Sequence, residues 1–298
     1  MADRGDEAIR VLLAGWFSIE DGGATAGDVL VRDAICDWLD ASAIPYDVAQ
    51  ERSLGPGVDW IRVAPSRYTH LVFACGPVGP DLAVGELIDR FAACRRVAIN
   101  VSSVGAPSWQ PFDLLLERDG AKSARPDLAL SRHSTQPPVA AVVRIRRQAE
   151  YPGGRPEDAH RAFDRLLASN RVAAFPVDTI LDPLIPGRRN AAEVEALIAR
   201  ADIVLTTRLH GLVLALAQGV PALAVDSVPG GAKVIAQARA LAWPAATTID
   251  ALDDAVLQRH FAWCLTAEAR QRTHACAADG RGAIEEIRST LITFICRR

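Results

Sequence analysis

The chain alternates short, continuously apolar runs with longer segments whose apolar residues recur at helical spacing, and this alternation constrains the fold most strongly. Residues 11–17 (VLLAGWF) and 70–76 (HLVFACG) are apolar runs typical of strands buried on both faces. A helical pattern begins between them at about residue 26. Repeated strand–helix units need right-handed crossovers, so they predict a parallel sheet that is covered by helices on both faces.

The same alternation occurs twice along the chain. The stretch around Gln136, Pro137 and Pro138 lacks periodicity and marks a junction. Further strands are predicted before it at residues 96–105 and 112–118, and after it at residues 138–147, 171–178, 202–208 and 220–226. The residues from 253 to 298 are mostly helical, with a break expected at Asp279 and Gly280.

The length of 298 residues suits two domains of about 150 residues each. We therefore expect an α/β protein in which two doubly wound, Rossmann-like domains face each other across a cleft. The expected bounds are residues 1–136 for the N-terminal domain and 137–270 for the C-terminal domain. Residues 271–298 form a further helix in this scheme, with the N-terminal domain as one surface on which it could pack. The cleft is the expected site, because ligands of such sheets bind beyond the carboxyl ends of the strands.

Charge and composition exclude several classes of function. The 33 Lys and Arg residues are balanced by 36 Asp and Glu residues, so the chain lacks the basic excess of a general nucleic-acid binder. We find no apolar run of about 18 residues and no secretory signal, so we expect no integral membrane segment and a cytoplasmic location. The six cysteines form no CxxC pair, which favours reduced thiols and predicts no metal site.

Residues 201–234 are the most informative segment. A strand (DIVLTT) ends at Thr206 and Thr207, and Arg208 and His210 follow on the turn into a helix. Either threonine could cap that helix, whose N-terminus favours negative charge. An arginine offers a fixed fork of donors to a carboxylate or phosphate, and a histidine can move a proton near neutral pH. The alternative is a structural histidine beside an arginine in a surface ion pair.

The next strand–helix turn offers a second set of groups suited to an anion. Gly230 and Gly231 precede a helix that opens at Lys233, and glycines at this position expose backbone N–H groups of the kind that cradle phosphates. Lys233 is notable because Lys122 is the only other lysine in the sequence. The alternative is an ordinary turn with the lysine directed toward water.

These motifs resemble the signature of the polysaccharide pyruvyl transferase family: D-hydrophobic-T-x-R-x-H-G, then G-V-P, then a loop with lysine. The matching residues are Asp202, Thr206, Arg208, His210, Gly211, Gly219, Pro221, Asp226 and Lys233. Shorter matches are Arg118, Asp119 and Ser123 for R-D-x-x-S, residues 127–130 for D-x-A-L, and Gly27 and Asp28 for N-x-G-D. The chain departs from the pattern at Thr25, where asparagine is usual, and at Cys75-Gly76-Pro77, where a glycine-rich turn is reduced.

The resemblance implies a transferase that moves the carboxyethylidene group of phosphoenolpyruvate onto two hydroxyls of a sugar, forming a ketal and releasing phosphate. It implies phosphoenolpyruvate as donor substrate, a sugar or polysaccharide acceptor that is free or lipid-linked, and no cofactor or metal. The donor carries a carboxylate and a phosphate, so its site needs clustered cations and N–H donors. The expected catalytic residues are His210 as general acid or base and Asp28 on the acceptor side. The expected substrate-binding residues are Arg208, Lys233, Gly230, Gly231, Thr207 and Arg118.

Other interpretations remain open at this point. The same architecture serves GT-B nucleotide-sugar glycosyltransferases, although residues 211–266 contain none of the glutamates that many retaining members use. A non-catalytic relative that binds anions or sugars is a third option. Single residues also have structural alternatives: a helix cap for Asp28 and an ion pair with Asp119 for Arg118. The arginines at 144, 146 and 147 could form a solvated strand edge or meet an anionic lipid-linked acceptor. Trp16 and Phe17 could stack on a sugar or belong to the core, and the other histidines (His70, His133, His160, His260 and His274) are expected to be structural.

Overall fold

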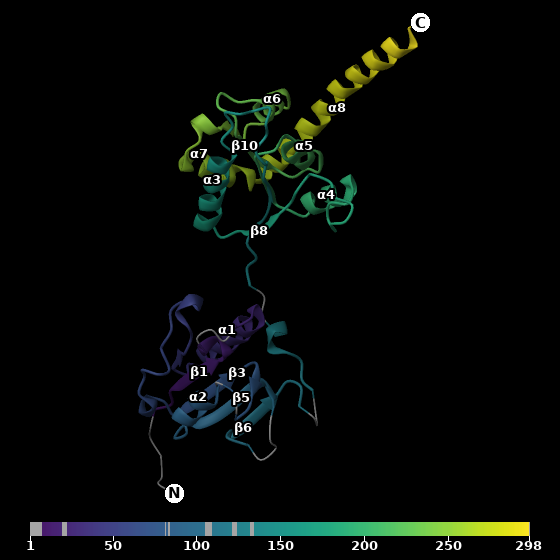
Figure 1. Cartoon of the computed structure of the whole chain (residues 1–298). Helices are drawn as coiled ribbons and strands as arrows, with labels where there is room; N and C mark the ends of the chain where they lie inside the picture. Colours follow the sequence, from purple (N-terminus) through teal and green to yellow (C-terminus); the bar gives the residue numbers. More distant parts are fainter. Residues whose placement is uncertain are drawn as a thin grey trace. The chain divides into compact units, whose positions relative to one another are not determined.

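The computed structural model describes residues 8–19, 23–80, 82, 84–104, 109–120, 124–131 and 134–297. The chain divides into two compact units, Met1–Thr135 and Gln136–Arg298, beside the junction expected at Gln136. Each unit contains one parallel sheet with helices against it (Figure 1). The two units are described separately below.

The sheet of the N-terminal unit has β1 between β2 and β3. Its strands are β1 (Val11–Gly15), β2 (Tyr46–Val48), β3 (His70–Ala74), β4 (Pro77–Val78), β5 (Arg95–Ser103) and β6 (Leu114–Glu117). All of their pairings are parallel. Pro77 pairs with Ser102 in the same register in which Ala74 pairs with Ile99, so β4 continues β3 beyond a short turn. Counting β3 and β4 as one strand, the order β2-β1-β3-β5-β6 is the flavodoxin-like order of doubly wound sheets.

The core of the N-terminal unit follows from the apolar runs. All five residues of β1 are buried, as expected for a strand covered on both faces. Its helices are α1 (Ala26–Ala41) and α2 (Val84–Arg90), with short 3-10 segments at Trp16–Ser18, Arg52–Leu54, Pro65–Arg67 and Leu128–Ser131. Val31 and Ile35 of α1 pack with Leu13 and Phe17 on one side of the sheet. Phe73 and Phe91 belong to a second cluster that also contains residues of α2.

The C-terminal unit repeats this topology. Its strands are β7 (Val139–Val143), β8 (Ala173–Pro176), β9 (Ile203–Thr206), β10 (Ala222–Asp226) and β11 (Ala246–Thr248). They are parallel in the order β11-β10-β9-β7-β8, again the flavodoxin-like order. Each unit is therefore a doubly wound, Rossmann-like α/β unit, and the expected fold class is confirmed. The arrangement of the two units about a cleft stays a prediction.

The helices of the C-terminal unit cover its sheet on both faces. They are α3 (Pro156–Ser169), α4 (Ala191–Ile198), α5 (Leu209–Ala217), α6 (Lys233–Ala240), α7 (Asp254–Cys264) and α8 (Ala267–Cys296), with a 3-10 turn at Ile249–Ala251. Helix α3 contacts α7, whereas α5 contacts both α4 and α6. These contacts agree with right-handed crossovers that place α3 and α7 on one face and α4, α5 and α6 on the other.

The helical break expected at Asp279 and Gly280 is wrong. Helix α8 is continuous through both residues and begins at Ala267, where Thr266 accepts a hydrogen bond from the N–H of Ala269 at 3.2 Å. A β carbon on Gly280 would lie 3.1 Å from Cδ2 of Leu241, a closer approach than most β carbons make. Residues 271–296 are thus part of a helix whose first turns belong to the C-terminal unit. Packing of this helix on the N-terminal unit stays a prediction.

Candidate functional site

Three guanidinium groups converge on one carboxylate at the carboxyl edge of the C-terminal sheet. Asp178 follows β8, and its Oδ2 lies 3.1 Å from Nη2 of Arg146 and 2.9 Å from Nη1 of Arg188. Its Oδ1 lies 3.7 Å from Nη1 of Arg208. We call Arg146, Arg188 and Arg208 the arginine cluster. They come from the loops after β7, β8 and β9, so the cluster lies where the strand order reverses, the usual ligand site of such sheets.

The arginine cluster carries more positive than negative charge. Asp182, at 3.3 Å from Nη2 of Arg188, is the second acid in contact with it. Three cations therefore share two carboxylates. In the described part of the chain, the buried Nε atoms of Arg188 and Arg208 have no hydrogen-bond partner. Arg208 is otherwise held by Thr179, whose Oγ1 lies 3.2 Å from its Nη1.

Thr207 holds together the two segments that carry Arg146 and Arg208 beyond the ends of β7 and β9. Its N–H donates to the carbonyl of Val143 at 3.1 Å, and its Oγ1 accepts from the N–H of Ile145 at 2.8 Å. These bonds extend the pairing of β7 with β9 beyond the ends of both strands. Thr207 is fully buried, so the structure assigns its side chain to positioning Arg146 and Arg208. Its contact with a substrate stays a prediction.

The spacing of the T-x-R-x-H-G motif has a packing reason. Thr206 Oγ1 accepts a hydrogen bond from the N–H of Arg208 at 2.9 Å and lies 2.9 Å from its carbonyl. A β carbon on Gly211 would clash with the hydroxyl oxygen of Thr206. It would also lie 2.9 Å from Thr206 Cβ and 3.0 Å from Val143. The glycine therefore allows the first turn of α5 to pack closely against the end of β9. In this arrangement Arg208 is the N-cap residue of the helix.

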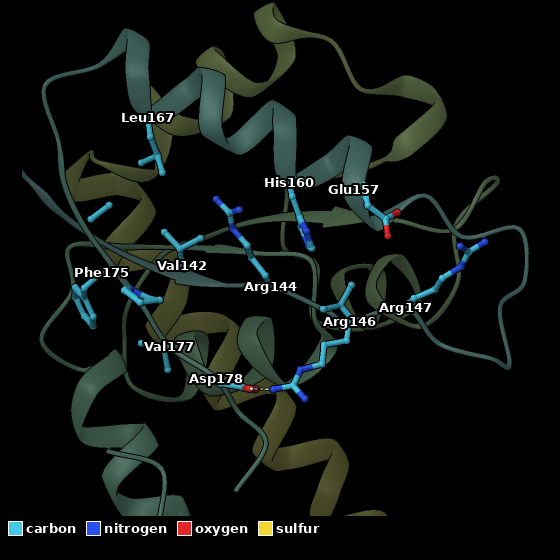
Figure 2. A pocket seen from close by; sticks show the side chains of 13 residues that line it. Val142, Arg144, Arg146, Arg147, Glu157, His160, Leu167, Phe175, Val177 and Asp178 are labelled. Atoms are coloured by element: carbon cyan, nitrogen blue, oxygen red, sulfur yellow. Dashed lines mark hydrogen bonds and ion pairs between the residues drawn. The ribbon is translucent and has the colours of Figure 1, made fainter. Parts of the chain in front are cut away.

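A cavity of about 570 Å³ lies between α3 and the strands β7 and β8. Its apolar walls include Val142, Leu167 and Phe175 (Figure 2). Its charged and polar lining comprises Arg144, Arg146, Arg147, Glu157, His160 and Asp178. Arg146 and Asp178 thus belong both to the cavity and to the arginine cluster (Figure 2).

His160 is the histidine that lines this cavity. It is half-buried on α3, and its Nε2 lies 3.4 Å from Oγ1 of Thr207. Burial, and then the charge of Arg144, lower its pKa below the ordinary value. The neutral imidazole is therefore favoured, and such a group can accept a proton. Sequence reasoning missed His160, although its place beside the buried residues Ala159 and Phe163 marks it as facing the sheet.

His210 lies at the start of the helix after β9, where the sequence predicts it. It lies in the first turn of α5, is exposed, and forms no hydrogen bond or ion pair with the described residues. The structure therefore places Arg208, but not His210, in contact with Asp178. The role of His210 as general acid or base stays a prediction.

Lys233 contacts the loop that follows β7. Its Nζ lies 3.9 Å from Oε1 of Glu150 and 5.3 Å from the centre of the Tyr151 ring. The lysine is about one third exposed and makes no contact with the arginine cluster among the interactions of the described residues. Its binding to a donor substrate stays a prediction.

The turn before α6 is already filled by a carboxylate of the chain itself. The buried Asp226, at the end of β10, accepts three hydrogen bonds through Oδ2 from the N–H groups of Ala232, Val234 and Ile235 at 2.7, 3.1 and 3.0 Å. Its Oδ1 accepts a fourth from Val228 at 3.1 Å. These are the donors that would otherwise hold an anion at a helix N-terminus.

The glycine N–H groups of this turn are also engaged. Gly230 donates to the carboxylate of Asp250, and Gly231 donates to the carbonyl of Val228 at 2.9 Å. Both glycines have positive φ angles, 74° and 87°, which explains their identity. The expectation that their free N–H groups form a phosphate cradle is therefore wrong in this structure. Contact of Gly230 and Gly231 with a ligand by other atoms stays a prediction.

In the N-terminal unit, Asp28 has the geometry of a helix cap. Its Oδ2 accepts from the N–H and the hydroxyl of Thr25 at 2.7 and 2.8 Å, and the Asp28 N–H lies 3.4 Å from Thr25 Oγ1. This reciprocal arrangement satisfies the first turn of α1. Thr25, which replaces the usual asparagine, is the N-cap. A catalytic role for Asp28 stays a prediction.

Arg118 belongs to a local ion-pair network of the same unit. Its Nη1 donates to Asp127 at 3.0 Å and its Nη2 to Ser102 at 3.0 Å, while Asp119 lies 3.9 Å away. The hydrogen bond to Asp127 is the main cause that raises the pKa of Arg118. The pair with Asp119 exists but is partly exposed, and Asp127 is the closer partner. Substrate binding by Arg118 stays a prediction.

The remaining expectations concern the aromatic residues and two positions outside the described part. Phe17 is buried in the core, and Trp16 donates its Nε1–H to the carbonyl of Pro77 at 3.0 Å. Ser123 and His133 lie outside the described residues. Among the residues that the structure describes, no three His, Cys, Asp or Glu side chains are grouped as metal ligands would be. Within the same residues, no helix is long and apolar enough to cross a membrane.

Part of the chain is similar to a known family of proteins. Residues 126–227 match the family model for polysaccharide pyruvyl transferase, so the resemblance is confirmed over this stretch. The match spans Arg146, Asp178, Arg188 and Arg208. No curated protein matches the sequence.

Three solved structures illustrate the low similarity of the chain to proteins of known structure. Spinosyn rhamnosyltransferase SpnG with thymidine diphosphate has a TM-score of 0.35 and 12% identity, over 91% of this chain and 96% of that chain. The kitacinnamycin glycotransferase has a TM-score of 0.33 and 9% identity, over 93% and 96%. A putative UDP-N-acetylglucosamine 2-epimerase from Listeria monocytogenes has a TM-score of 0.29 and 11% identity, over 96% and 98%. The fold assignment above rests on the strand orders alone.

Proposed function

We propose that this chain, which matches the polysaccharide pyruvyl transferase family over residues 126–227, transfers the carboxyethylidene group of phosphoenolpyruvate to two hydroxyls of a sugar. The acceptor would be a sugar of a polysaccharide or of its precursor, free or lipid-linked. The products are a pyruvate ketal and inorganic phosphate. A cytoplasmic location is part of this proposal.

The arginine cluster is the observation that supports this proposal. Phosphoenolpyruvate carries a carboxylate and a phosphate close together, and it needs several fixed donors of positive charge. Arg146, Arg188 and Arg208 provide three guanidinium groups against two carboxylates, at the edge of the sheet where ligands bind. Among these groups the cluster keeps an excess of one positive charge, which favours an anionic ligand.

The proposed chemistry needs one proton on carbon and the loss of two from hydroxyls. A proton added to C3 of phosphoenolpyruvate turns its methylene into a methyl group and makes C2 electrophilic. One sugar hydroxyl then forms a bond to C2 and loses its proton. The second hydroxyl forms the other C2–O bond and loses its proton as the C2–O bond to phosphate breaks, and phosphate leaves with that proton. Guanidinium groups on the phosphate would stabilise the charge that develops on the leaving group.

Two histidines are candidates for the proton transfers. His210 is the one that the family motif indicates, and it lies two residues after Arg208 in the first turn of α5. His160 is the one that lines the cavity beside Arg146, with the pKa lowered by burial. We propose His210 as the general acid or base, with His160 as the alternative residue for this role. Substitution of each histidine in turn distinguishes the two.

The other expected residues take supporting roles in the proposal. Lys233 would bind the donor after leaving Glu150, and Thr207 would hold Arg208 in place. Gly230 and Gly231 would let the loop approach the donor closely. Asp28 and Arg118 would contact the acceptor from the N-terminal unit. No cofactor is proposed besides the donor substrate.

Phosphate release in the presence of phosphoenolpyruvate tests the proposal. The wild-type chain, His210→Ala and His160→Ala would be assayed with a panel of hexose and N-acetylhexosamine acceptors. We expect acceptor-dependent release that His210→Ala abolishes and a product whose mass increases by one carboxyethylidene group. Loss of release in His160→Ala but not in His210→Ala would transfer the proton role to His160.

Ligand-dependent thermal stabilisation separates this proposal from glycosyl transfer. Phosphoenolpyruvate is expected to raise the melting temperature, because it binds the folded state, whereas UDP and GDP are expected to leave it unchanged. Stabilisation by a nucleoside diphosphate without any effect of phosphoenolpyruvate would favour a nucleotide-sugar glycosyltransferase. Stabilisation by phosphoenolpyruvate without phosphate release from any acceptor would favour a non-catalytic relative.

A further inference from the structure

The carboxylate of Asp178 lies where the three guanidinium groups of the arginine cluster meet. Its Oδ2 lies 3.1 Å from Nη2 of Arg146 and 2.9 Å from Nη1 of Arg188. Its Oδ1 lies 3.7 Å from Nη1 of Arg208. Guanidinium groups converge in the same way on the carboxylates and phosphates of ligands. An anionic ligand and Asp178 would therefore compete for the same N–H donors.

Asp178 leaves some donors of the arginine cluster without a partner. The distance of 3.7 Å between Asp178 and Arg208 exceeds the length of a hydrogen bond. Among the described residues, the buried Nε atoms of Arg188 and Arg208 also lack a hydrogen-bond partner. A buried donor without a partner is costly, so these groups favour a further acceptor. An anion with more oxygen atoms than one fixed carboxylate could serve more of these donors.

The side chain of Asp178 is held by few contacts besides these arginines. It follows β8, is 26% exposed, and forms part of the wall of the cavity between α3 and the sheet (Figure 2). Its other hydrogen-bond partner among the described residues is the N–H of Ile180, at 2.9 Å from Oδ1. Rotation about the Cα–Cβ bond moves such a carboxylate between staggered positions. The arginines and one local hydrogen bond therefore hold it, and the packed core does not.

Asp182, the second acid of this site, is placed differently. Its Oδ2 lies 3.3 Å from Nη2 of Arg188, and this is its ion pair among the described residues. It therefore neutralises charge without standing where the three guanidinium groups meet. Asp178 and Asp182 carry the same charge beside the same arginine, so a comparison of the two separates the effect of position from that of net charge.

We propose that Asp178 closes the arginine cluster in the ligand-free protein and is displaced by the anion that binds there. Its carboxylate is an internal competitor that lowers the affinity of the cluster for anions. A ligand with one negative charge would only replace one carboxylate by another, whereas a ligand with two anionic groups also reaches the donors that Asp178 leaves unpaired. The inference rests on the proposed function in one point, the use of the arginine cluster as an anion site, and adds that the ligand has to be multiply charged.

NMR titration of the full chain with sulfate tests the displacement without reference to the transfer reaction. The Nε–H signals of Arg188 and Arg208 would be followed as sodium sulfate, a doubly charged anion, replaces sodium chloride at constant ionic strength. Asp178→Asn and Asp178→Ser remove the carboxylate but keep an acceptor for the N–H of Ile180. Asp182→Asn is the matched control. Phosphoenolpyruvate would be titrated in the same way, and thermal unfolding without sulfate checks that each variant folds.

Displacement of Asp178 predicts a gain of affinity when its carboxylate is removed. Asp178→Asn should bind sulfate about ten- to 50-fold more tightly than the wild type, because the anion no longer competes with a carboxylate in contact with three arginines. Asp178→Ser should also bind sulfate more tightly. Asp182→Asn should gain at most about fivefold, since only one contact with one arginine is lost. Phosphoenolpyruvate should give the same order of affinities.

Three results would overturn the inference. The first is that folded Asp178→Asn and Asp178→Ser bind sulfate no more tightly than the wild type, or that no chain binds it. The second is an equal gain in Asp178→Asn and Asp182→Asn, which would reduce the effect to net charge. The third is that neither Asp178 variant folds, because a ligand cannot displace a carboxylate that the fold requires.

The phosphate-release assay keeps this inference separate from the proposed function. Acceptor-dependent phosphate release by the wild type, together with any of these three results, would uphold the transfer reaction and remove the role of Asp178. Tighter sulfate binding by Asp178→Asn, without phosphate release from phosphoenolpyruvate with any acceptor, would uphold the role of Asp178 and remove the transfer reaction.

Discussion

Removal of the Asp226 carboxylate should destabilise the C-terminal unit more than most single substitutions do. In Asp226→Ala, four backbone N–H groups lose their acceptor: Val228, Ala232, Val234 and Ile235. Val234 and Ile235 are buried, whereas Val228 and Ala232 are partly accessible to water. Water can therefore replace the acceptor for only some of these donors.

The magnitude follows from the two buried donors. Each buried N–H group without an acceptor costs about 1–3 kcal/mol, and the partly accessible pair adds less. We expect Asp226→Ala to lower the free energy of unfolding by about 3–5 kcal/mol, which corresponds to a melting temperature lower by roughly 6–20 °C for a unit of this size. Asp226→Asn keeps one acceptor oxygen and should cost less than half as much.

Unfolding in guanidinium chloride and amide hydrogen exchange together measure the loss of stability in Asp226→Ala. The unfolding curve of Asp226→Ala should shift to lower denaturant, and the amides of Val234 and Ile235 should lose most of their protection. The amides of a distant helix such as α1 serve as the internal control. Wild-type protection at both amides, or an unfolding curve that overlays the wild type, would show that Asp226 does not hold this turn.

Three further predictions follow from particular side chains. Gly211→Ala should lower the free energy of unfolding by about 1–3 kcal/mol because its β carbon meets packed atoms; Gly282→Ala, where nothing lies within 4 Å, should be neutral or slightly stabilising in the same denaturation experiment. Burial lowers the pKa of His160 in the folded chain below the ordinary 6.5. As the pH drops, the unfolded state therefore takes up the proton before the folded state does. The free energy of unfolding should fall as the pH drops from about 6.5 through the lowered pKa. His160→Gln should make that fall smaller, and an unchanged pH profile of unfolding would contradict the prediction. Iodoacetamide at neutral pH should modify the exposed Cys296 and spare Cys75, which is buried and has its pKa raised to about 12, as peptide mass spectrometry of the native chain can check.

The fold could be predicted from the sequence because its signals are local. A run such as residues 11–15 is apolar at every position because the strand is covered on both faces, and this pattern needs no knowledge of its partners. The continuity of α8 was not predictable in this way. Gly280 weakens a helix locally, and the close approach of Leu241 to it in the folded chain cannot be read from the sequence.

The candidate site was predictable only where one strand end carries it. Arg208 could be predicted as a site residue because it comes directly after β9, at the edge of the sheet where ligands bind. Asp178 and Arg188 could not be found, since their partners come from other strand ends far along the chain. The glycine turn was misread for a similar reason: the sequence shows the N–H donors, but not that Asp226 reaches back to occupy them.

Calorimetric titration with phosphoenolpyruvate tests most directly whether the arginine cluster is an anion site. Arg208→Ala should weaken binding about ten- to 150-fold, the value of a charge-assisted hydrogen bond to an anion. The fold should survive, because Asp178 keeps Arg146 and Arg188 as its closer partners. Arg165→Ala removes the same charge from a surface pair with Asp254 and should leave the affinity unchanged. Equal affinity of Arg208→Ala and the wild type for phosphoenolpyruvate would contradict the account.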